Sequence, residues 1–185
     1  MHLLRDLDQN NCELIFKTAG PIYQLTYSRS GKYLAMATEE PTAILYFSDK
    51  KTFVRCRTAH TSSVFCVGFS FDEKYMFSTA ADGFLKIYKI EEEVSQMCSF
   101  DIATSVNMNP LQKLQTSINP EGKLLAAPGR PHLQLVFLEA GKMYLTASTT
   151  IKHLTDICIC HWHSNNILIT TSIDRETCIW NYKTG

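Results

Sequence analysis

Four stretches of this chain follow the same plan, and this repetition limits the fold more than any other feature of the sequence. Each stretch reads as an apolar strand, a tight polar turn, a second apolar strand, a short turn and a third strand. The segments alternate with a period of two and are rich in Val, Ile, Thr, Tyr and Phe, and no long stripe keeps the 3.6-residue period of a helix. The sequence therefore predicts an all-β chain. The four stretches are 20–47, 60–90, 111–138 and 153–182.

The spacing of equivalent residues indicates the kind of repeat. Intervals of 42 to 49 residues separate the residues that end the first strand of each unit, and those that close the third strand are spaced in the same way. This period is close to the ~40–45 residues of the WD repeat, whose unit is a four-stranded β-propeller blade. TPR and ankyrin units are about ten residues shorter and helical. The residues are Tyr27, Phe69, Ile118 and Trp162 in the first strands, and Tyr46, Tyr88, Val136 and Trp180 in the third.

A fourth strand fits upstream of each unit, at 12–18, 53–58, 96–102 and 143–148. We therefore expect residues 1–185 to form part of a WD-repeat propeller, with about four blades present in units of approximately 12–49, 51–90, 94–138 and 143–182. Residues 104–110 read as an enlarged loop, which explains the longest interval. Because WD-repeat rings usually have more than four blades, we expect the chain to be a piece of a larger propeller of about seven.

Composition and charge exclude several classes of protein. Of 185 residues, 45% are hydrophobic, which argues against intrinsic disorder, and 18 basic residues balance 18 acidic ones, which argues against a domain built to neutralise phosphates. Charged residues interrupt the first eleven positions, so no signal peptide is predicted, and no apolar run approaches the ~20 residues of a membrane span. Seven cysteines without a framework spacing favour a reducing compartment, either the nucleus or the cytosol.

Two of the units resemble the WD family closely. A histidine before the first strand, an aspartate in the second hairpin and an aromatic residue in the third strand occur in both. In that family these residues form a hydrogen-bonded chain with a Ser or Thr of the second strand, and the resemblance implies a blade-stabilising network rather than a catalytic one. The implied members are His60, Ser78 (or Thr79), Asp82 and Tyr88 in the second unit, and His153, Thr170 (or Thr171), Asp174 and Trp180 in the fourth. The first and third units have Glu40 and Arg130 in place of the aspartate, so we expect their blades to depend on packing.

One cluster has the residue types of a metal site. Residues 158–163 contain two cysteines and two histidines, but on a strand Cys158 and Cys160 point to one face while His161 and His163 point to the other. Four ligands on opposite faces cannot converge on one tetrahedral ion, so no metal is predicted there. The sequence also lacks a phosphate-binding loop, a Gly-x-Ser-x-Gly elbow and a His-Glu-x-x-His motif. We therefore predict no catalytic residue, no cofactor and no small-molecule substrate.

The third unit carries a more specific resemblance. Residues 122–137, which read GKLLAAPGRPHLQLVF, are similar to a blade of the WD-repeat and HMG-box DNA-binding protein family, with Pro128 as the most distinctive residue because a proline within a strand removes a ladder hydrogen bond. That family is a replisome adaptor that ties the helicase to DNA polymerase alpha. The resemblance implies a non-catalytic scaffold of chromatin and DNA replication in the nucleus.

Two other functions stay open at this point. The chain could be a WD-repeat scaffold of another complex, such as a histone chaperone, a ubiquitin-ligase adaptor or a trafficking coat, with a cytoplasmic location as the alternative. It could also be a propeller enzyme or metal binder. In each scaffold reading the partners are other proteins that bind the loop faces, with indirect association with chromatin or DNA and none with membranes.

Predicted turns contain basic residues that could contact a partner. They could form a modest basic patch for chromatin or an acidic peptide, or they could be ordinary solvated loop residues. These residues are Arg29, Lys32, Lys74, Arg130, His132 and Arg175.

Overall fold

The computed structural model describes residues 2–6, 11–57, 60–102, 115–129, 132–139 and 142–184. Over these ranges the chain forms strands and turns, and none of it forms a helix long and apolar enough to cross a membrane. The strands are β1 (His2–Asp6), β2 (Asn11–Phe16), β3 (Ile22–Tyr27), β4 (Tyr33–Thr38), β5 (Ile44–Phe47), β6 (Thr52–Arg55), β7 (Val64–Phe69), β8 (Tyr75–Ala80), β9 (Phe84–Lys89), β10 (Ser95–Asp101), β11 (Ser117–Ile118), β12 (Leu124–Ala127), β13 (His132–Glu139), β14 (Lys142–Lys152), β15 (Ile157–Trp162), β16 (Ile167–Ser172) and β17 (Thr177–Asn181).

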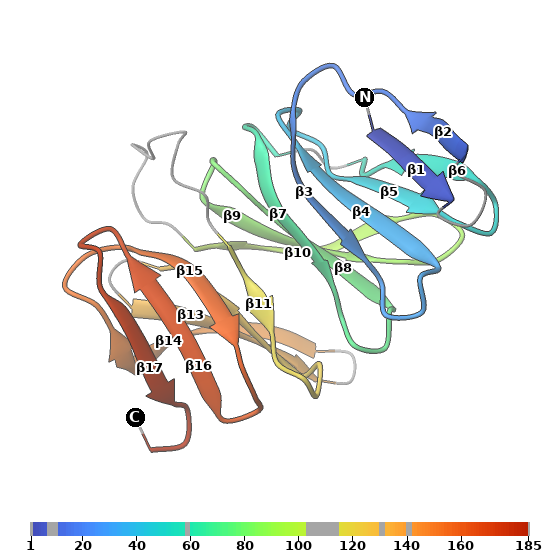
Figure 1. Cartoon of the computed structure of the whole chain (residues 1–185). Coiled ribbons are helices and arrows are strands. Elements are labelled where there is room, and N and C mark those ends of the chain that lie inside the picture. The colour runs from blue at the N-terminus through green and yellow to red at the C-terminus, as the bar shows by residue number, and fades with distance from the viewer. Residues whose placement is uncertain are drawn as a thin grey trace.

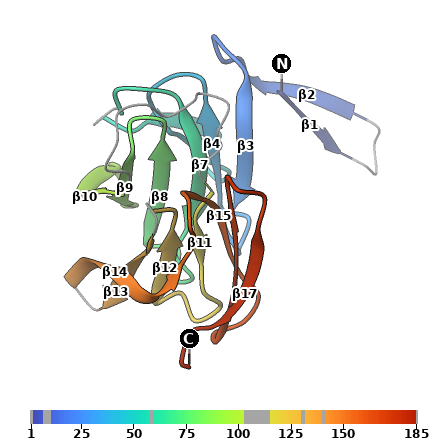
Figure 2. The same ribbon diagram turned by 90° about the vertical axis from the view of Figure 1, so that its left-hand side faces the viewer.

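The strands make four successive antiparallel sheets (Figure 1). The strand orders are β3-β4-β5-β6, β7-β8-β9-β10, β11-β12-β13-β14 and β15-β16-β17, so each strand pairs with the next one along the chain. The first strands of neighbouring sheets approach each other: β3 contacts β7, and β11 contacts β15. This arrangement is that of an all-β propeller with four blades in the described part of the chain, and the predicted fold class is confirmed. A separate hairpin, β1–β2, extends beyond the first blade (Figure 2).

The fourth strands lie where the sequence places them, but each one completes the sheet of the unit before it. β6 pairs with β5 and β10 pairs with β9, because only short turns separate them and an antiparallel hairpin is the nearest available partner. Similarly, 143–148 lies within β14, which pairs with β13. The segment 12–18 overlaps β2, whose partner β1 was not predicted. The blades therefore run across the repeat units, and the predicted loop at 104–110 lies outside the described residues.

The sequence analysis did not predict two local features of the strands. The inner strands β3, β7 and β15 each shift register near their first residues, as a β-bulge does, and this changes which residues face inward. Pro128 lies one residue beyond the end of β12 rather than inside a strand, so it removes no hydrogen bond from the ladder. The neighbouring Gly129 carbonyl accepts a hydrogen bond from the Ile157 amide of the next blade at 3.1 Å.

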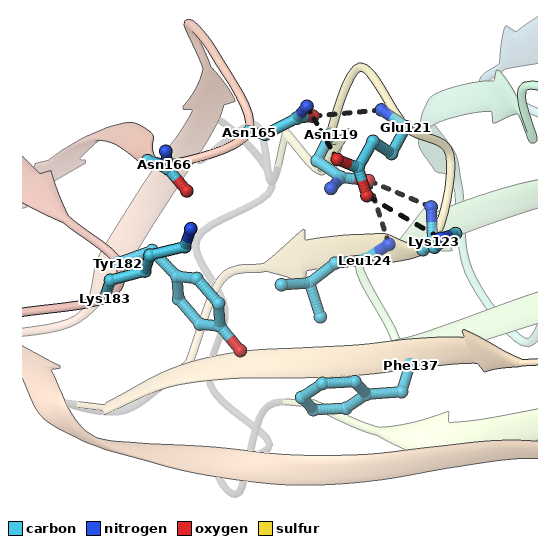
Figure 3. Close-up of a pocket in the computed structure, with 9 residues that line it drawn as sticks. All are labelled: Asn119, Glu121, Lys123, Leu124, Phe137, Asn165, Asn166, Tyr182 and Lys183. Carbon is cyan, nitrogen blue, oxygen red and sulfur yellow. Dashed lines mark hydrogen bonds and ion pairs between the residues drawn. The ribbon is translucent and has the colours of Figure 1, made fainter.

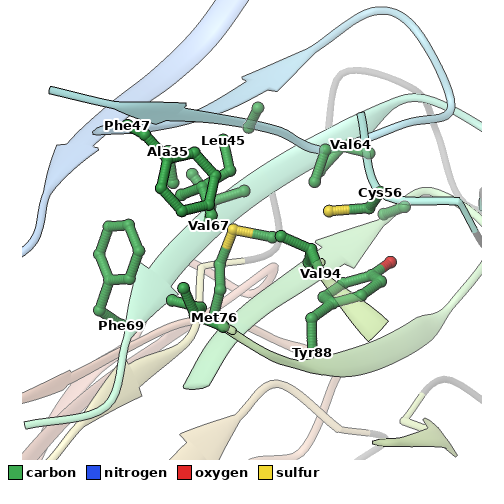
Figure 4. Close-up of a cluster of buried hydrophobic side chains, with 14 residues drawn as sticks. Ala35, Leu45, Phe47, Cys56, Val64, Val67, Phe69, Met76, Tyr88 and Val94 are labelled. Carbon is green, nitrogen blue, oxygen red and sulfur yellow. The ribbon is translucent and has the colours of Figure 1, made fainter. Parts of the chain in front are cut away.

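Apolar side chains fill the spaces between successive blades. Between the first and second blades, Leu45 and Val64 are fully buried and Tyr88 is 1% exposed (Figure 4). A second cluster joins the second and third blades, with Leu85 and Val136 at its centre, and a third joins the last two. Because alternate residues of a strand point to opposite faces, each inner blade buries both of its faces.

Polar turns link the blades at one end of the molecule. These turns follow the first strand of each blade, and we call them the first-turn end. The carboxylate of Glu73 accepts hydrogen bonds from the Ser30 amide at 2.5 Å and its hydroxyl at 2.6 Å. The Asn165 side chain accepts from the Glu121 amide at 3.1 Å and donates to its carboxylate at 2.9 Å. These bonds tie the first blade to the second and the third to the fourth.

Gly122 closes the remaining junction, between the second and third blades. It has a φ of +72°, and a Cβ placed on it would lie 3.0 Å from the backbone nitrogen of Phe71 and overlap the Cβ of that residue. Gly31 has a similar φ of +75°, but a Cβ there would meet nothing within 4 Å. Two separate constraints therefore require glycine at position 122: the positive φ of its backbone and the close approach of the neighbouring blade.

These two glycines give a matched test of blade packing. We expect Gly122→Ala to lower the free energy of unfolding by about 3 kcal/mol, because it adds a clash to the strained φ. Gly31→Ala should cost only about 1 kcal/mol, since it has the strain alone. Urea denaturation followed by tryptophan fluorescence measures both, and equal losses would contradict the packing described here.

Candidate functional site

The second blade contains a hydrogen-bonded chain around His60. The ring lies before β7, with its Nε2 2.8 Å from the Ser78 hydroxyl of β8 and its Nδ1 3.0 and 3.1 Å from the two oxygens of Asp82. Asp82 also accepts hydrogen bonds from the amides of Thr61 at 2.9 Å and Phe84 at 3.0 Å. The carboxylate therefore holds the ring with Nδ1 protonated and fixes the turn between β8 and β9.

The electrostatics of Asp82 follow from these contacts. Burial acts to raise the pKa of this carboxyl, but the hydrogen bonds from His60 and the two amides outweigh it, and the pKa is lowered. Both ring nitrogens of His60 are occupied and its side chain is fully buried. Tyr88, the implied fourth member, packs in the cluster between the first two blades. Thr79, the alternative to Ser78, is also buried. The hydrogen bonds of His60 and Asp82 thus join the segment before β7 to β8 and to the β8–β9 turn.

The fourth blade has the same residue types in a different arrangement. His153 Nε2 lies 2.7 Å from the Thr170 hydroxyl, and the Trp180 indole N–H donates to the same hydroxyl at 2.7 Å. Asp174 does not reach His153: its Oδ1 accepts a hydrogen bond from the Ser172 hydroxyl and another from the Glu176 amide at 3.1 Å. As a result, Nδ1 of His153 and Oδ2 of Asp174 are buried without a hydrogen-bond partner among the described residues.

The first blade replaces the aspartate with an ion pair that the sequence did not predict. The Glu40 carboxylate pairs with Arg55 of β6 and accepts a hydrogen bond from the Ala19 amide at 3.2 Å. Burial acts to raise the pKa of Glu40, but Arg55 and the amide outweigh it, and the pKa is lowered. Blade one therefore has a charged pair in addition to packing. Arg130, the residue at this position in the third unit, lies outside the described residues.

The cysteine and histidine cluster of β15 does not converge. The register shift at the start of β15 leaves Cys158 half-buried, while Cys160 and Trp162 are buried toward the third blade and His161 is exposed. Burial raises the pKa of the Cys160 thiol well above its usual value and that of Cys56 to about 12. These two thiols therefore stay protonated and pack as small apolar side chains.

The predicted contact residues divide between the two ends of the propeller. Arg29, Lys32 and Lys74 lie in turns of the first-turn end, whereas Arg175 lies in the opposite β16–β17 turn and His132 begins β13. The Arg29 guanidinium lies 4.3 Å from the centre of the Phe71 ring and has no ion pair among the described residues. Lys74 pairs with Asp72 at 3.6 Å, and His132 Nδ1 donates to the Ser148 carbonyl at 3.1 Å.

Among the described residues, two hollows larger than a third one beside them open near the first-turn end. The larger has a volume of about 500 Å³ and lies along the inner strands β3, β7 and β11, with the half-exposed rings of Tyr27 and Phe71 and the Arg29 side chain in its wall. The smaller, of about 340 Å³, lies between the third and fourth blades, where Tyr182 extends toward Leu124 and Phe137 (Figure 3). The sequence did not predict either one, because each is lined by several strands that are distant along the chain.

Comparison with known proteins agrees with this fold. The family model described as WD domain, G-beta repeat matches residues 51–89. A chain in the crystal structure of a mitotic checkpoint complex aligns with a TM-score of 0.75 at 16% identity, over 99% of this chain and 55% of that one. The β-propeller domain of Cps50 (Swd1) from Myceliophteria thermophila aligns with a TM-score of 0.65 at 13% identity, over 88% of this chain and 54% of that one.

A curated relative matches a shorter part of the chain. Autophagy-related protein 18 of Debaryomyces hansenii is 32% identical over 74 residues, which is 38% of this chain and 13% of that protein. The chain thus spans about half the length of the solved structures named above. None of these matches confirms the resemblance to the WD-repeat and HMG-box DNA-binding protein family.

The difference between the two histidine networks can be tested by removing each aspartate. We expect Asp82→Ala to lower the free energy of unfolding by about 3 kcal/mol, because it leaves a buried ring N–H and two amides without their acceptor. Asp174→Ala should cost clearly less, since that carboxylate stabilises only its own turn. Chemical denaturation measures both, and equal losses would show that Asp174 also holds its histidine.

Proposed function

We propose that this chain is a non-catalytic scaffold that binds another protein at the first-turn end of the propeller. The observation that carries the proposal is the 500 Å³ hollow with Arg29, Tyr27 and Phe71 in its wall. WD-repeat propellers generally act as protein-interaction scaffolds and typically lack catalytic activity. Docking on turns that join rigid strands is the usual way in which such a fold binds a partner.

The chemistry of the hollow indicates the kind of segment that it would hold. Phe71 is 50% exposed and Tyr27 48% exposed, and exposed aromatic rings beside an arginine are the residues that most often dominate binding energy. The Arg29 guanidinium stacks on Phe71 and keeps its hydrogen-bond donors for a ligand. A peptide with an acidic residue next to an apolar one would match this surface.

The absence of catalysis is also part of the proposal. Both ring nitrogens of His60 are hydrogen-bonded within the blade, and the buried thiols of Cys56 and Cys160 are held protonated. The His60 chain therefore supports structure rather than proton transfer. No group in the 500 Å³ hollow pairs a nucleophile with a base among the described residues.

The process that the scaffold serves is a finer proposal. A role as a nuclear adaptor of chromatin and DNA replication is supported by the similarity of residues 122–137 to one blade of the replisome-adaptor family. The similarity to Autophagy-related protein 18 favours the alternative, a scaffold of another process. The first role would place the chain in the nucleus, and the alternative would place it in the cytoplasm. The identity of the bound proteins separates the two.

Affinity capture with variants of the hollow tests the docking surface. The double variant Arg29→Glu, Phe71→Ala should lose the captured partner by at least about tenfold, because it removes the charge and the ring together. Arg175→Glu, at the opposite end, is the matched control and should capture normally. Quantitative mass spectrometry of the recovered proteins measures both.

Unchanged recovery by the double variant would contradict docking at the first-turn end. Helicase or DNA polymerase alpha subunits among the proteins lost would support the replication adaptor. Loss of a different complex would support the alternative, and fluorescence imaging of the tagged chain would place either one in the nucleus or the cytoplasm.

A further inference from the structure

Three residues of metal-ligating type meet in the fourth blade. A ring nitrogen of His153, a carboxylate oxygen of Glu176 and Sγ of Cys178 all lie within 4.8 Å of one another. His153 lies between β14 and β15, while Glu176 and Cys178 belong to the β16–β17 turn and to β17. The sheet register therefore brings together residues that are more than twenty positions apart in the sequence.

His153 is arranged as a metal-binding histidine is. Its ring is buried, its Nε2 is hydrogen-bonded to the Thr170 hydroxyl at 2.7 Å, and its Nδ1 has no partner among the described residues. A histidine that binds a metal through one nitrogen usually directs the other toward an oxygen, which fixes the tautomer and the ring orientation. Thr170 also accepts a hydrogen bond from the Trp180 indole, which fixes the hydroxyl that contacts the His153 ring. A buried nitrogen without a partner is costly, and a metal ion would remove that cost.

Backbone hydrogen bonds hold the two other residues, Glu176 and Cys178, in place. The Glu176 amide donates to Asp174 at 3.1 Å and its carbonyl accepts from the Ser172 amide at 3.1 Å. Cys178 lies directly opposite Thr170 in the β16–β17 ladder, so its thiol is on the same side of the sheet as the hydroxyl that holds His153. The Glu176 side chain is exposed, and Cys178 is a free, half-buried thiol.

We propose that His153, Glu176 and Cys178 form a binding site for a divalent transition-metal ion, with Zn²⁺ as the ion that this ligand set fits best. Imidazole and thiolate select zinc, and a thiolate with a carboxylate balances its two charges. Ligands of one tetrahedral ion lie about 3.3–3.8 Å apart, so the three side chains need to close by about 1 Å. The Cys178 thiol releases its proton to solvent on binding, and water completes the coordination. The ion would join the β14–β15 connection to the edge strand β17.

The second blade shows what this position looks like without such a site. Its corresponding hairpin has Phe84 and Lys86 where the fourth blade has Glu176 and Cys178, and Asp82 occupies Nδ1 of its histidine. The ligand residues and the unpartnered nitrogen thus occur together in one blade and are absent together from the other.

Metal titration of the whole chain tests the site. The reduced, chelator-treated protein should bind one equivalent of Zn²⁺ with a rise in its melting temperature, and Co²⁺ should give the absorption band of a cobalt–thiolate bond. Cys178→Ser should abolish the band and weaken Zn²⁺ binding at least about 100-fold, and Glu176→Gln at least about tenfold. Both residues lie at the sheet edge, so these variants should fold. Cys158→Ser, which changes another half-buried thiol of the same blade, is the control and should leave both readouts unchanged.

Three results would overturn the proposal. They are failure of the wild-type chain to bind stoichiometric Zn²⁺, a cobalt–thiolate band that persists in Cys178→Ser, and loss of binding in Cys158→Ser equal to that in Cys178→Ser. In the first case, the Asp174 carboxylate would occupy Nδ1 of His153 in solution, as Asp82 does for His60.

Discussion

Burial of flat apolar sheet faces against one another is the constraint on which this structure depends. A four-stranded antiparallel sheet with apolar residues on both faces is unstable alone in water, and it becomes stable when a neighbour covers each face. The second and third blades have neighbours on both sides, and their central strands β8 and β12 are buried almost throughout. The fourth blade is covered on one face, and Ile179 on the other face is 72% exposed. Stability therefore lies between the blades more than within them.

Hydrogen bonds and ion pairs fix the hairpins within the blades, in addition to the apolar packing between blades. Three of the blades each have a polar network at or beside the hairpin between their second and third strands. The first has a charged pair at Glu40, the second a carboxylate on His60, and the fourth a shared hydroxyl at Thr170 of β16. Of the two blades with a histidine, only the second has hydrogen bonds to both ring nitrogens among the described residues. Among the described residues, the fourth blade leaves a histidine nitrogen and a carboxylate oxygen unpaired, and the zinc proposal explains the unpaired nitrogen.

The repeat made the fold predictable, because the period of the units and their alternation depend only on local sequence. The sequence did not show which unit each fourth strand pairs with. A fourth strand can pair with the unit before it or with the unit after it, and the outcome depends on which of these partners lies nearer in the folded chain. The register shifts at Tyr23, Phe65 and Cys158 have no clear sequence signal, and they alter which side chains face inward. The contacts of His60 are made with Ser78 and Asp82, two residues that the family resemblance named. The orientation of Asp174 toward Ser172 depends on a serine that the resemblance does not include. The hollow at Arg29 arises from three blades, so no single unit reveals it.

Hydrogen–deuterium exchange of the purified chain tests most directly whether stability lies between the blades. Amides of β7 and β8, which are covered on both faces, should exchange slowest and with similar protection. Amides of β16, which is hydrogen-bonded to a strand on each side but has a buried residue only at every second position, should exchange much faster. Equal protection of β16 and β8 would contradict the account, because hydrogen bonding within each sheet would then be sufficient without the packing of its faces.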